Sequence, residues 1–220
     1  MIKKQIEFDF LKRDKELNKG ERIAKIITLL TISPFQIVAY LSLAGGIFPI
    51  WIYPLLNTLV NTISGIFFLL IPLLPLIILN RRSRLEGGQL SRDDRYIIFL
   101  SIIPGYLILI FIYNIIGVSM NVLMSPLINF VISYIVILLI EFIITIGLKF
   151  KTSMHVSGAV CSITSMSFYF GGLILLLLLF VIIIAWARWK IKGHTIPQLI
   201  SGWVIGIFIT MICQIILLTI

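Results

Sequence analysis

The sequence predicts an all-α fold, a polytopic integral membrane bundle of about seven transmembrane helices with its N terminus in the cytoplasm. The first reason is composition. Hydrophobic residues make up 60% of the 220 residues, charged residues make up 12%, and the mean hydropathy is +1.12. An ordinary soluble domain carries about 25% charged residues, so these values exclude one. The second reason is that charged residues cluster in a few short segments, separated by apolar runs long enough to cross a bilayer.

The first apolar run covers residues 26–80 and leaves room for two helices of about 20 residues each. Glycine and proline residues at 45–54 predict the turn between them. The next run, 96–140, predicts two more helices with a break near 117–121. A single carboxylate, Glu141, interrupts the second of these helices.

The run 156–187 can be divided in two ways. As one straight helix its 32 residues would extend about 48 Å, well beyond a hydrocarbon core of about 30 Å. Two helices fit better, with a break at Gly171 and Gly172. A further helix follows Pro197, a residue suited to the first helical turn.

The basic residues test the count of seven spans independently. With seven spans, all 18 Lys and Arg residues lie on one membrane face, whereas a six-span alternative puts residues 188–192 on the other face. The positive-inside rule then places this face, and the N terminus, in the cytoplasm of a multi-pass cell-membrane protein. The 18 basic residues fall at 3–25, 81–95, 149–151 and 188–192.

The net charge of +9 is therefore interpreted as membrane topology, and we expect no nucleic-acid partner. We expect residues 1–25 to form a basic cytoplasmic segment and residues 26–220 a single transmembrane domain. The first segment either lies on the membrane as an interfacial helix or is a solvated tail.

The two histidines of the chain, His155 and His194, both lie at the cytoplasmic start of a predicted span. A helix start presents free N–H groups and the positive end of its dipole, which favours an anion. Lys151 and Ser153 precede the first histidine, and Arg188 precedes the second. This combination predicts a phosphate site that needs no metal. The other interpretation is that basic loops with idle histidines occur in many membrane proteins.

The sequence around both histidines resembles the type 2 phosphatidic acid phosphatase superfamily of lipid phosphatases and haloperoxidases. Thr152-Ser153-Met154-His155 is similar to its Pro-Ser-Gly-His motif, and Arg188-x5-His194-x3-Gln198 is similar to Arg-x5-His-x3-Asp. A divergent prokaryotic branch carries Lys-x-Ser-x-His and an earlier Arg-x-x-Arg, which Lys151 to His155 and Arg92 to Arg95 resemble. The resemblance covers about 92–202, within a catalytic core of 92–220.

The resemblance implies hydrolysis of a lipid phosphate or diphosphate through a phosphohistidine, without metal or cofactor. His194 would be the nucleophile and His155 the general acid and then base. Gln198 would orient the nucleophilic imidazole. Substrates implied are phosphatidic acid, phosphatidylglycerol phosphate or a polyprenyl diphosphate. The residues implied to bind phosphate are Arg188, Lys151, Ser153, Arg92 and Arg95.

Gln198 stands where the family has an Asp. An amide can orient the imidazole but brings no negative charge to a developing imidazolium. Either turnover is slow or another carboxylate helps, with Asp93 and Asp94 as candidates and Glu141 a weaker one. A carboxylate inside a span is a functional hypothesis by default, and the alternative for Glu141 is a protonated or hydrogen-bonded helix contact.

Small residues predict which helices touch. Gly158, Ser162 and Ser165 form a stripe on one predicted span, and Gly202 and Gly206 form one on the last span. Such stripes let helices approach closely. If these two spans touch, both histidines are brought together at their starts.

Two other functions remain open. The first is a non-catalytic relative that binds or transports anionic lipid. The second is an unrelated small transporter, which predicts polar residues near the middle of the bilayer or helices broken at a central site.

Overall fold

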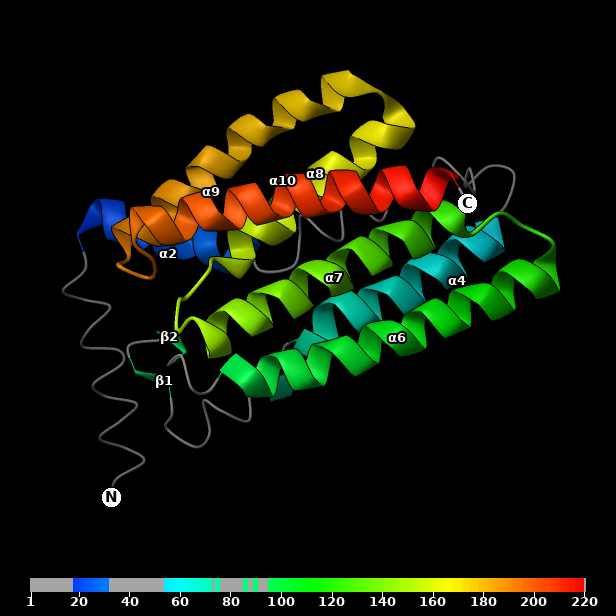
Figure 1. Cartoon of the computed structure of the whole chain (residues 1–220), viewed down its shortest axis with the longest axis horizontal. Helices are drawn as coiled ribbons and strands as arrows, with labels where there is room; N and C mark the ends of the chain where they lie inside the picture. The colour runs from blue at the N-terminus through cyan, green and yellow to red at the C-terminus, as the bar shows by residue number, and fades with distance from the viewer. Residues whose placement is uncertain are drawn as a thin grey trace.

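The computed structural model describes residues 18–31, 54–72, 74–75, 85–86, 89–90 and 95–219. Apart from one small antiparallel hairpin, β1 (Leu85–Glu86) with β2 (Gln89–Leu90), the elements of these residues are helical (Figure 1). The helices are α2 (Lys19–Thr31), α4 (Pro54–Gly65) with the π-helical η1 (Ile66–Leu70), α6 (Arg95–Met120), α7 (Ser125–Gly147), α8 (Met154–Phe170), the 3-10 helix η2 (Gly172–Leu177), α9 (Leu178–Lys190) and α10 (Ile196–Thr219).

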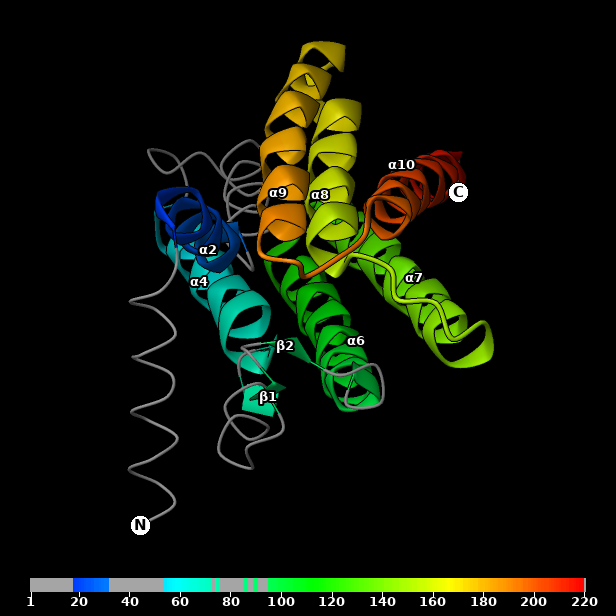
Figure 2. The same ribbon diagram turned by 90° about the vertical axis from the view of Figure 1, so that its left-hand side faces the viewer.

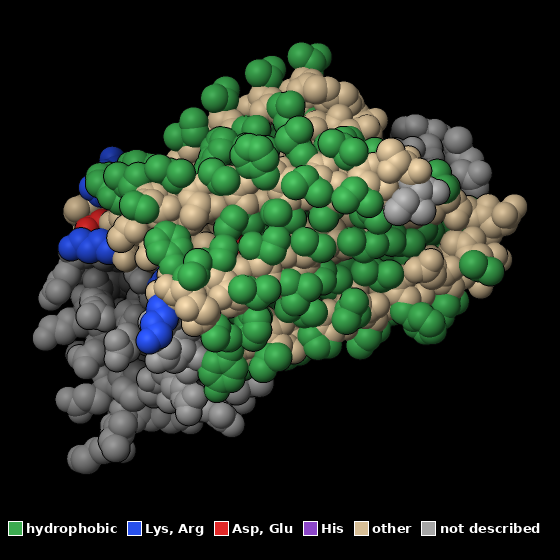
Figure 3. Space-filling model, in the orientation of Figure 1, with side chains coloured by type: hydrophobic (Ala, Val, Ile, Leu, Met, Phe, Trp, Pro, Cys, Tyr) green, Lys and Arg blue, Asp and Glu red, His purple; other side chains and the backbone are tan. Residues whose placement is uncertain are grey.

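Four helices of the described residues are long and apolar enough to cross a membrane: Tyr96–Met120, Ser125–Gly147, Gly172–Lys190 and Ile196–Thr219. Their outward side chains are large and apolar; Phe111 is 66% exposed and Phe208 is 61% exposed. Figure 3 shows hydrophobic side chains along the whole visible length of the bundle, with Lys and Arg at one end. This surface suits lipid rather than water. The prediction of an all-helical membrane-embedded protein is confirmed at this level.

Consecutive helices from α6 to α10 alternate in direction along the long axis (Figure 1). The chain turns at residues 121–124 and at Gly171 at one end, and at 148–153 and 191–195 at the other. Asn121 and Gly171 have positive φ values of 51° and 92°, which end α6 and α8. Both predicted breaks, near 117–121 and at 171–172, are thus confirmed. Within the described residues, the basic loops 148–153 and 191–195 share one end.

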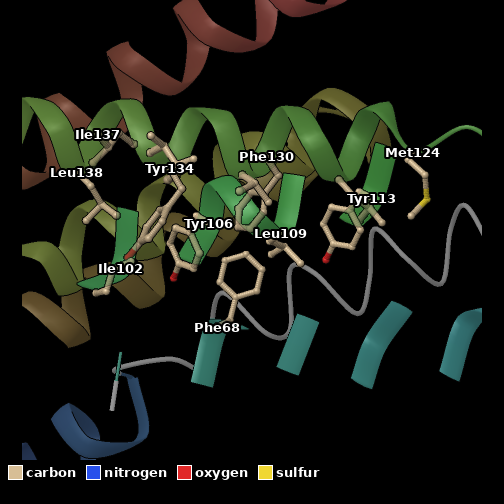
Figure 4. Packing of buried hydrophobic residues seen from close by; sticks show 14 of the residues in the cluster. Phe68, Ile102, Tyr106, Leu109, Tyr113, Met124, Phe130, Tyr134, Ile137 and Leu138 are labelled. Carbon is tan, nitrogen blue, oxygen red and sulfur yellow. The ribbon is translucent and has the colours of Figure 1, made fainter. Parts of the chain in front are cut away.

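An aromatic core joins α4 and η1 to α6 and α7. Phe68 of η1 lies with its ring centroid 5.0 Å from that of Tyr106 and 5.8 Å from that of Phe130 (Figure 4). Tyr106 in turn lies 5.5 Å from Tyr134 of α7. All four rings are buried, so this part of the bundle is held by large interdigitated side chains.

A second apolar cluster joins α8, α9 and α10 where α8 and α10 begin and α9 ends. Val156 of α8, Ile184 of α9 and Leu199 of α10 belong to it and are buried. Figure 2 views the bundle from this end and shows α8 and α9 side by side.

The closest helix contact is between α8 and α10. A Cβ added to Gly202 would lie 2.8 Å from the Ser153 carbonyl oxygen, and one added to Gly206 would lie 2.9 Å from Val160 Cβ. Real Cβ atoms essentially never come so close, so both positions require glycine. The predicted contact through Gly202 and Gly206 is confirmed, although the α8 residues opposite the two glycines are Ser153, Val156, Ser157 and Val160.

The helix α2 begins inside the charged segment 1–25, and it packs against α9. Asn18 and Glu21 form a reciprocal cap at its start, in which each side-chain oxygen accepts the backbone N–H of the other residue. Ala24 is fully buried. Residues 19–25 are therefore part of a packed helix rather than a solvated tail. The predicted turn at 45–54 lies outside the described residues, except for Pro54, where α4 begins.

We predict that Gly206→Ala destabilises the bundle by about 1–3 kcal/mol, the usual cost of overpacking, because the new methyl group meets the Ser157 carbonyl oxygen at 3.0 Å. Thermal unfolding in detergent measures this. Gly65→Ala is the matched control, since nothing lies within 4 Å of a Cβ at that helical position. Equal unfolding temperatures for the two variants would contradict the contact.

Candidate functional site

The loops 148–153 and 191–195 lead into the starts of α8 and α10, and these two starts are in contact. The Ser153 carbonyl oxygen lies against Gly202, within the second turn of α10. Both helices therefore point their free N–H groups and positive dipole ends to the same end of the bundle, the end that faces the viewer in Figure 2. Such an arrangement attracts an anion.

The end of α9 positions Arg188. The Gly193 N–H donates to the Arg188 carbonyl at 2.9 Å, and the Lys192 N–H donates to the Trp189 carbonyl at 2.9 Å. With Lys192 in the left-handed region at φ 56°, these bonds form a Schellman motif. The motif turns the chain back over the last helical turn, so that a Cβ on Gly193 would lie 2.9 Å from Arg188 Nη2.

Arg188 and His194 are both buried, although each belongs to a polar residue type that is usually exposed. Arg188 is 8% exposed and His194 is 5% exposed. A guanidinium in the last turn of α9 also interacts favourably with the negative end of the helix dipole. The structure thus keeps a cation and an imidazole out of solvent. Arg188 directly precedes the turn 189–193, and His194 directly follows it.

The start of α8 carries the other predicted residues. Ser153 takes the N-cap position with an extended backbone, but its hydroxyl makes no capping bond to the helix. That hydroxyl is fully buried and makes no hydrogen bond to any described residue. Lys151 and His155 flank it in the chain and are half-buried.

Gln198 has a structural role at the start of α10 that the motif comparison did not consider. Its Oε1 accepts the backbone N–H of Thr195 at 3.1 Å. Thr195 precedes the first residue of α10 and Gln198 is the third, so the pair is half of a capping box. The Thr-x-x-Gln spacing is the sequence signal for this cap. The predicted orienting role of Gln198 stays a prediction beside it.

The structure describes the remaining candidate residues only in part. Arg95 is the first residue of α6, which begins at the same end of the bundle as α8 and α10 (Figure 1). Arg92, Asp93 and Asp94 lie outside the described residues.

Glu141 is the carboxylate that the structure brings to α8. It is fully buried in α7, and its Oε1 accepts the hydroxyl of Ser157 at 2.8 Å. Ser157 lies in the first turn of α8, two residues after His155. This bond agrees with the alternative that Glu141 makes a hydrogen-bonded contact between helices.

Buried polar side chains lie on the packed faces of α7, α8 and α10 at spacings of four or eight residues. The sequence analysis found only the small residues on two of these faces and missed the polar residues of α7 and those of α10. At their far end the Gln214 amide donates to Ser133 and Ser165, each at 3.3 Å, and accepts Tyr169 at 3.2 Å. The i, i+4 spacing was visible in the sequence, because it puts the residues on one helix face. These residues are Asn129, Ser133, Glu141 and Thr145 on α7, the N-cap Ser153 with Ser157 and Ser165 on α8, and Thr210 and Gln214 on α10, where Gly202 and Gly206 continue the same face.

The chemistry open to this end of the bundle is anion binding with an imidazole at hand. Arg188 supplies fixed positive charge, Ser153 a hydroxyl donor, and the helix starts N–H groups. In the part of the chain that the structure describes, no three His, Cys, Asp or Glu residues gather into a group that could hold a metal ion.

Comparisons of the chain with protein-family models, with curated proteins and with solved structures find no match. The relation to lipid phosphatases stays a prediction that rests on the motif residues, chiefly Ser153, His155, Arg188 and His194.

We predict that Gln198→Ala lowers the stability of the protein by about 1 kcal/mol because it removes the cap of α10. Gln198→Glu should keep the wild-type stability, since glutamate also serves at this position of a capping box. Thermal unfolding in detergent compares the two variants. If both unfold at the wild-type temperature, the bond to Thr195 does not stabilise the helix start.

Proposed function

We propose that this protein is an integral-membrane lipid phosphatase that hydrolyses a phosphate or diphosphate ester of a lipid through a phosphohistidine, without a metal ion. One observation carries the proposal. The starts of α8 and α10 touch at Ser153 and Gly202, while the turn from α9 to α10 buries Arg188 and His194 at the same end. Residues of two separate motifs thus belong to one end of one helix group.

In the proposed reaction, an imidazole nitrogen of His194 attacks phosphorus, and the bond from phosphorus to the lipid oxygen breaks. His155 donates a proton to that leaving oxygen. A water molecule then attacks the phosphohistidine, and His155 takes its proton. Inorganic phosphate leaves and His194 is restored. Each step needs only protons, water and the two imidazoles.

The transferred phosphoryl group carries charge on three oxygens, so its stabilisation depends on fixed donors and cations. Arg188 is suited to grip two oxygens at once because guanidinium is planar. Lys151 would add a point charge. The Ser153 hydroxyl has no partner among the described residues and would donate to a third oxygen.

The proposed substrate is a phospholipid or a polyprenyl phosphate whose head group reaches the cytoplasmic surface. The described basic residues of the loops lie at the end of the bundle that carries the histidines, and the positive-inside rule assigns that end to the cytoplasm. The seven spans expected from the sequence agree with this orientation. The tail of the substrate would stay in the lipid beside the helices.

We predict that purified wild-type protein releases inorganic phosphate from short-chain phosphatidic acid or a polyprenyl diphosphate in the presence of a chelator. His194→Ala should abolish release, and His155→Ala should slow it by about 10²–10⁴-fold, the usual contribution of a general acid. Phosphate release is measured with a colorimetric assay in detergent micelles. Release that persists in His194→Ala would contradict the phosphohistidine.

The second candidate is a non-catalytic protein that binds or moves anionic lipid. The specific observation in its favour is Gln198, whose amide oxygen caps α10 at the position where the resembling family has a catalytic carboxylate. A site that binds an anion but has no carboxylate to stabilise a developing imidazolium is suited to binding rather than to catalysis.

Vanadate, which adopts the five-coordinate geometry of the phosphoryl centre, separates the two candidates. For a phosphatase we predict thermal stabilisation of the wild type by vanadate, worth about 2.7 kcal/mol at a hundredfold excess over Kd, and its loss in His194→Ala. A lipid-binding protein should instead show no special response to vanadate. Its phosphatidic acid binding should survive His194→Ala and fail in Arg188→Ala.

A further inference from the structure

Glu141 is a buried carboxyl side chain that has no role in the proposed reaction. Its side chain is fully buried in α7, in a helix that otherwise packs through apolar and small polar residues. A carboxylate at such depth is costly and is retained where it has a specific partner or task. The structure describes two acidic side chains, Glu141 and Glu21. Of these, Glu21 caps α2.

The bond from Ser157 to Glu141 connects this carboxylate to the start of α8. The Ser157 hydroxyl donates to Glu141 Oε1 at 2.8 Å, while the Ser157 N–H donates to the Ser153 carbonyl at 3.0 Å. The same carbonyl lies against Gly202 of α10. The first turn of α8 is thus clamped between Glu141 on one side and α10 on the other.

His155 belongs to this clamped turn, and Ser153 caps it. A shift of the turn would move the proposed general acid and a proposed phosphate donor together. Displacement of a reacting group by about 1 Å costs about 10²-fold in rate.

We infer that Glu141 is a positioning residue that, through Ser157, holds the first turn of α8 and thereby His155 in place for catalysis. The inference rests on the proposed phosphatase activity. It assigns Glu141 no contact with the substrate and no step of proton transfer.

The test measures kcat and KM for phosphate release by wild type, Glu141→Leu, Glu141→Gln and Ser157→Ala. Leucine is of similar bulk but cannot accept the Ser157 hydroxyl, whereas the amide oxygen of glutamine can still accept it. Glu141→Leu and Ser157→Ala should lower kcat by about 10- to 100-fold with little change in KM. The two changes combined should cost little more than one alone, because both break the same bond.

Ser133→Ala is the matched control. It also removes a buried serine hydroxyl that bonds a polar side chain of another helix, here Gln214, but about two helical turns along α7 from Glu141. It should lower the unfolding temperature about as much as Ser157→Ala and leave kcat unchanged. Glu141→Gln should keep most of the kcat that Glu141→Leu loses, because its amide oxygen can still accept the Ser157 hydroxyl, and this recovery supports positioning through the bond.

Two results overturn the inference separately from the proposed function. If wild type releases phosphate and Glu141→Leu keeps its kcat, Glu141 is not a positioning residue although the protein is a phosphatase. The same holds if Ser133→Ala lowers kcat as much as Ser157→Ala does, since the effect would then follow from general loosening. If wild type releases no phosphate from any lipid tested, the phosphatase proposal fails, and this inference with it. Should Glu141→Leu fail to fold, Ser157→Ala alone decides between these outcomes.

Discussion

The contact between the carbonyl of Ser153 and Gly202 is the constraint on which the rest of the candidate site depends. It fixes the starts of α8 and α10 against each other at a separation that no side chain larger than hydrogen allows. Close approach through small residues is the usual way in which membrane helices gain packing energy, because lipid offers no hydrophobic driving force between them. The roles proposed for His155 and His194 require this local geometry, since each is within two residues of a helix start.

Much of the architecture could be predicted from the sequence because membrane helices are limited by hydrocarbon thickness and by charge. Length alone required the run 156–187 to break, and the double glycine at 171–172 gave the position. The contact through Gly202 and Gly206 followed from residue size. The exact partners on α8 could not be predicted, because the choice between neighbouring faces of a helix depends on the crossing angle and on where α9 and α7 pack.

The candidate site was less predictable than the fold. The burial of Arg188 depends on a Schellman turn in which Lys192, not glycine, takes the left-handed conformation, and few sequence rules anticipate a lysine there. The bond between Glu141 and Ser157 joins residues on different helices, so no spacing rule within one helix reveals it. The cap by Gln198, by contrast, was visible as Thr-x-x-Gln and was overlooked because the motif comparison drew attention to a missing Asp.

The polar stripes join α7, α8 and α10 by hydrogen bonds at two positions along the bundle. Ser157 bonds Glu141 near one end, and Gln214 bonds Ser133 and Ser165 near the other, so polar contacts and apolar packing alternate along the same three helices. Hydrogen bonds between membrane helices are individually modest, yet they are directional. They specify register where interchangeable leucine and isoleucine side chains do not.

The attachment of α10 at Gly202 and again at Gln214, twelve residues or about 18 Å further along the helix, restricts how this part of the molecule can move. A helix held at two separated positions cannot slide along its neighbour or rotate about its own axis without breaking at least one of the two contacts. Rocking or piston motions of α10 are thereby disfavoured. Access for a bulky molecule would have to come from displacement of the connecting loops or of the helices outside this trio, and the inner three-helix group would act as a fixed wall.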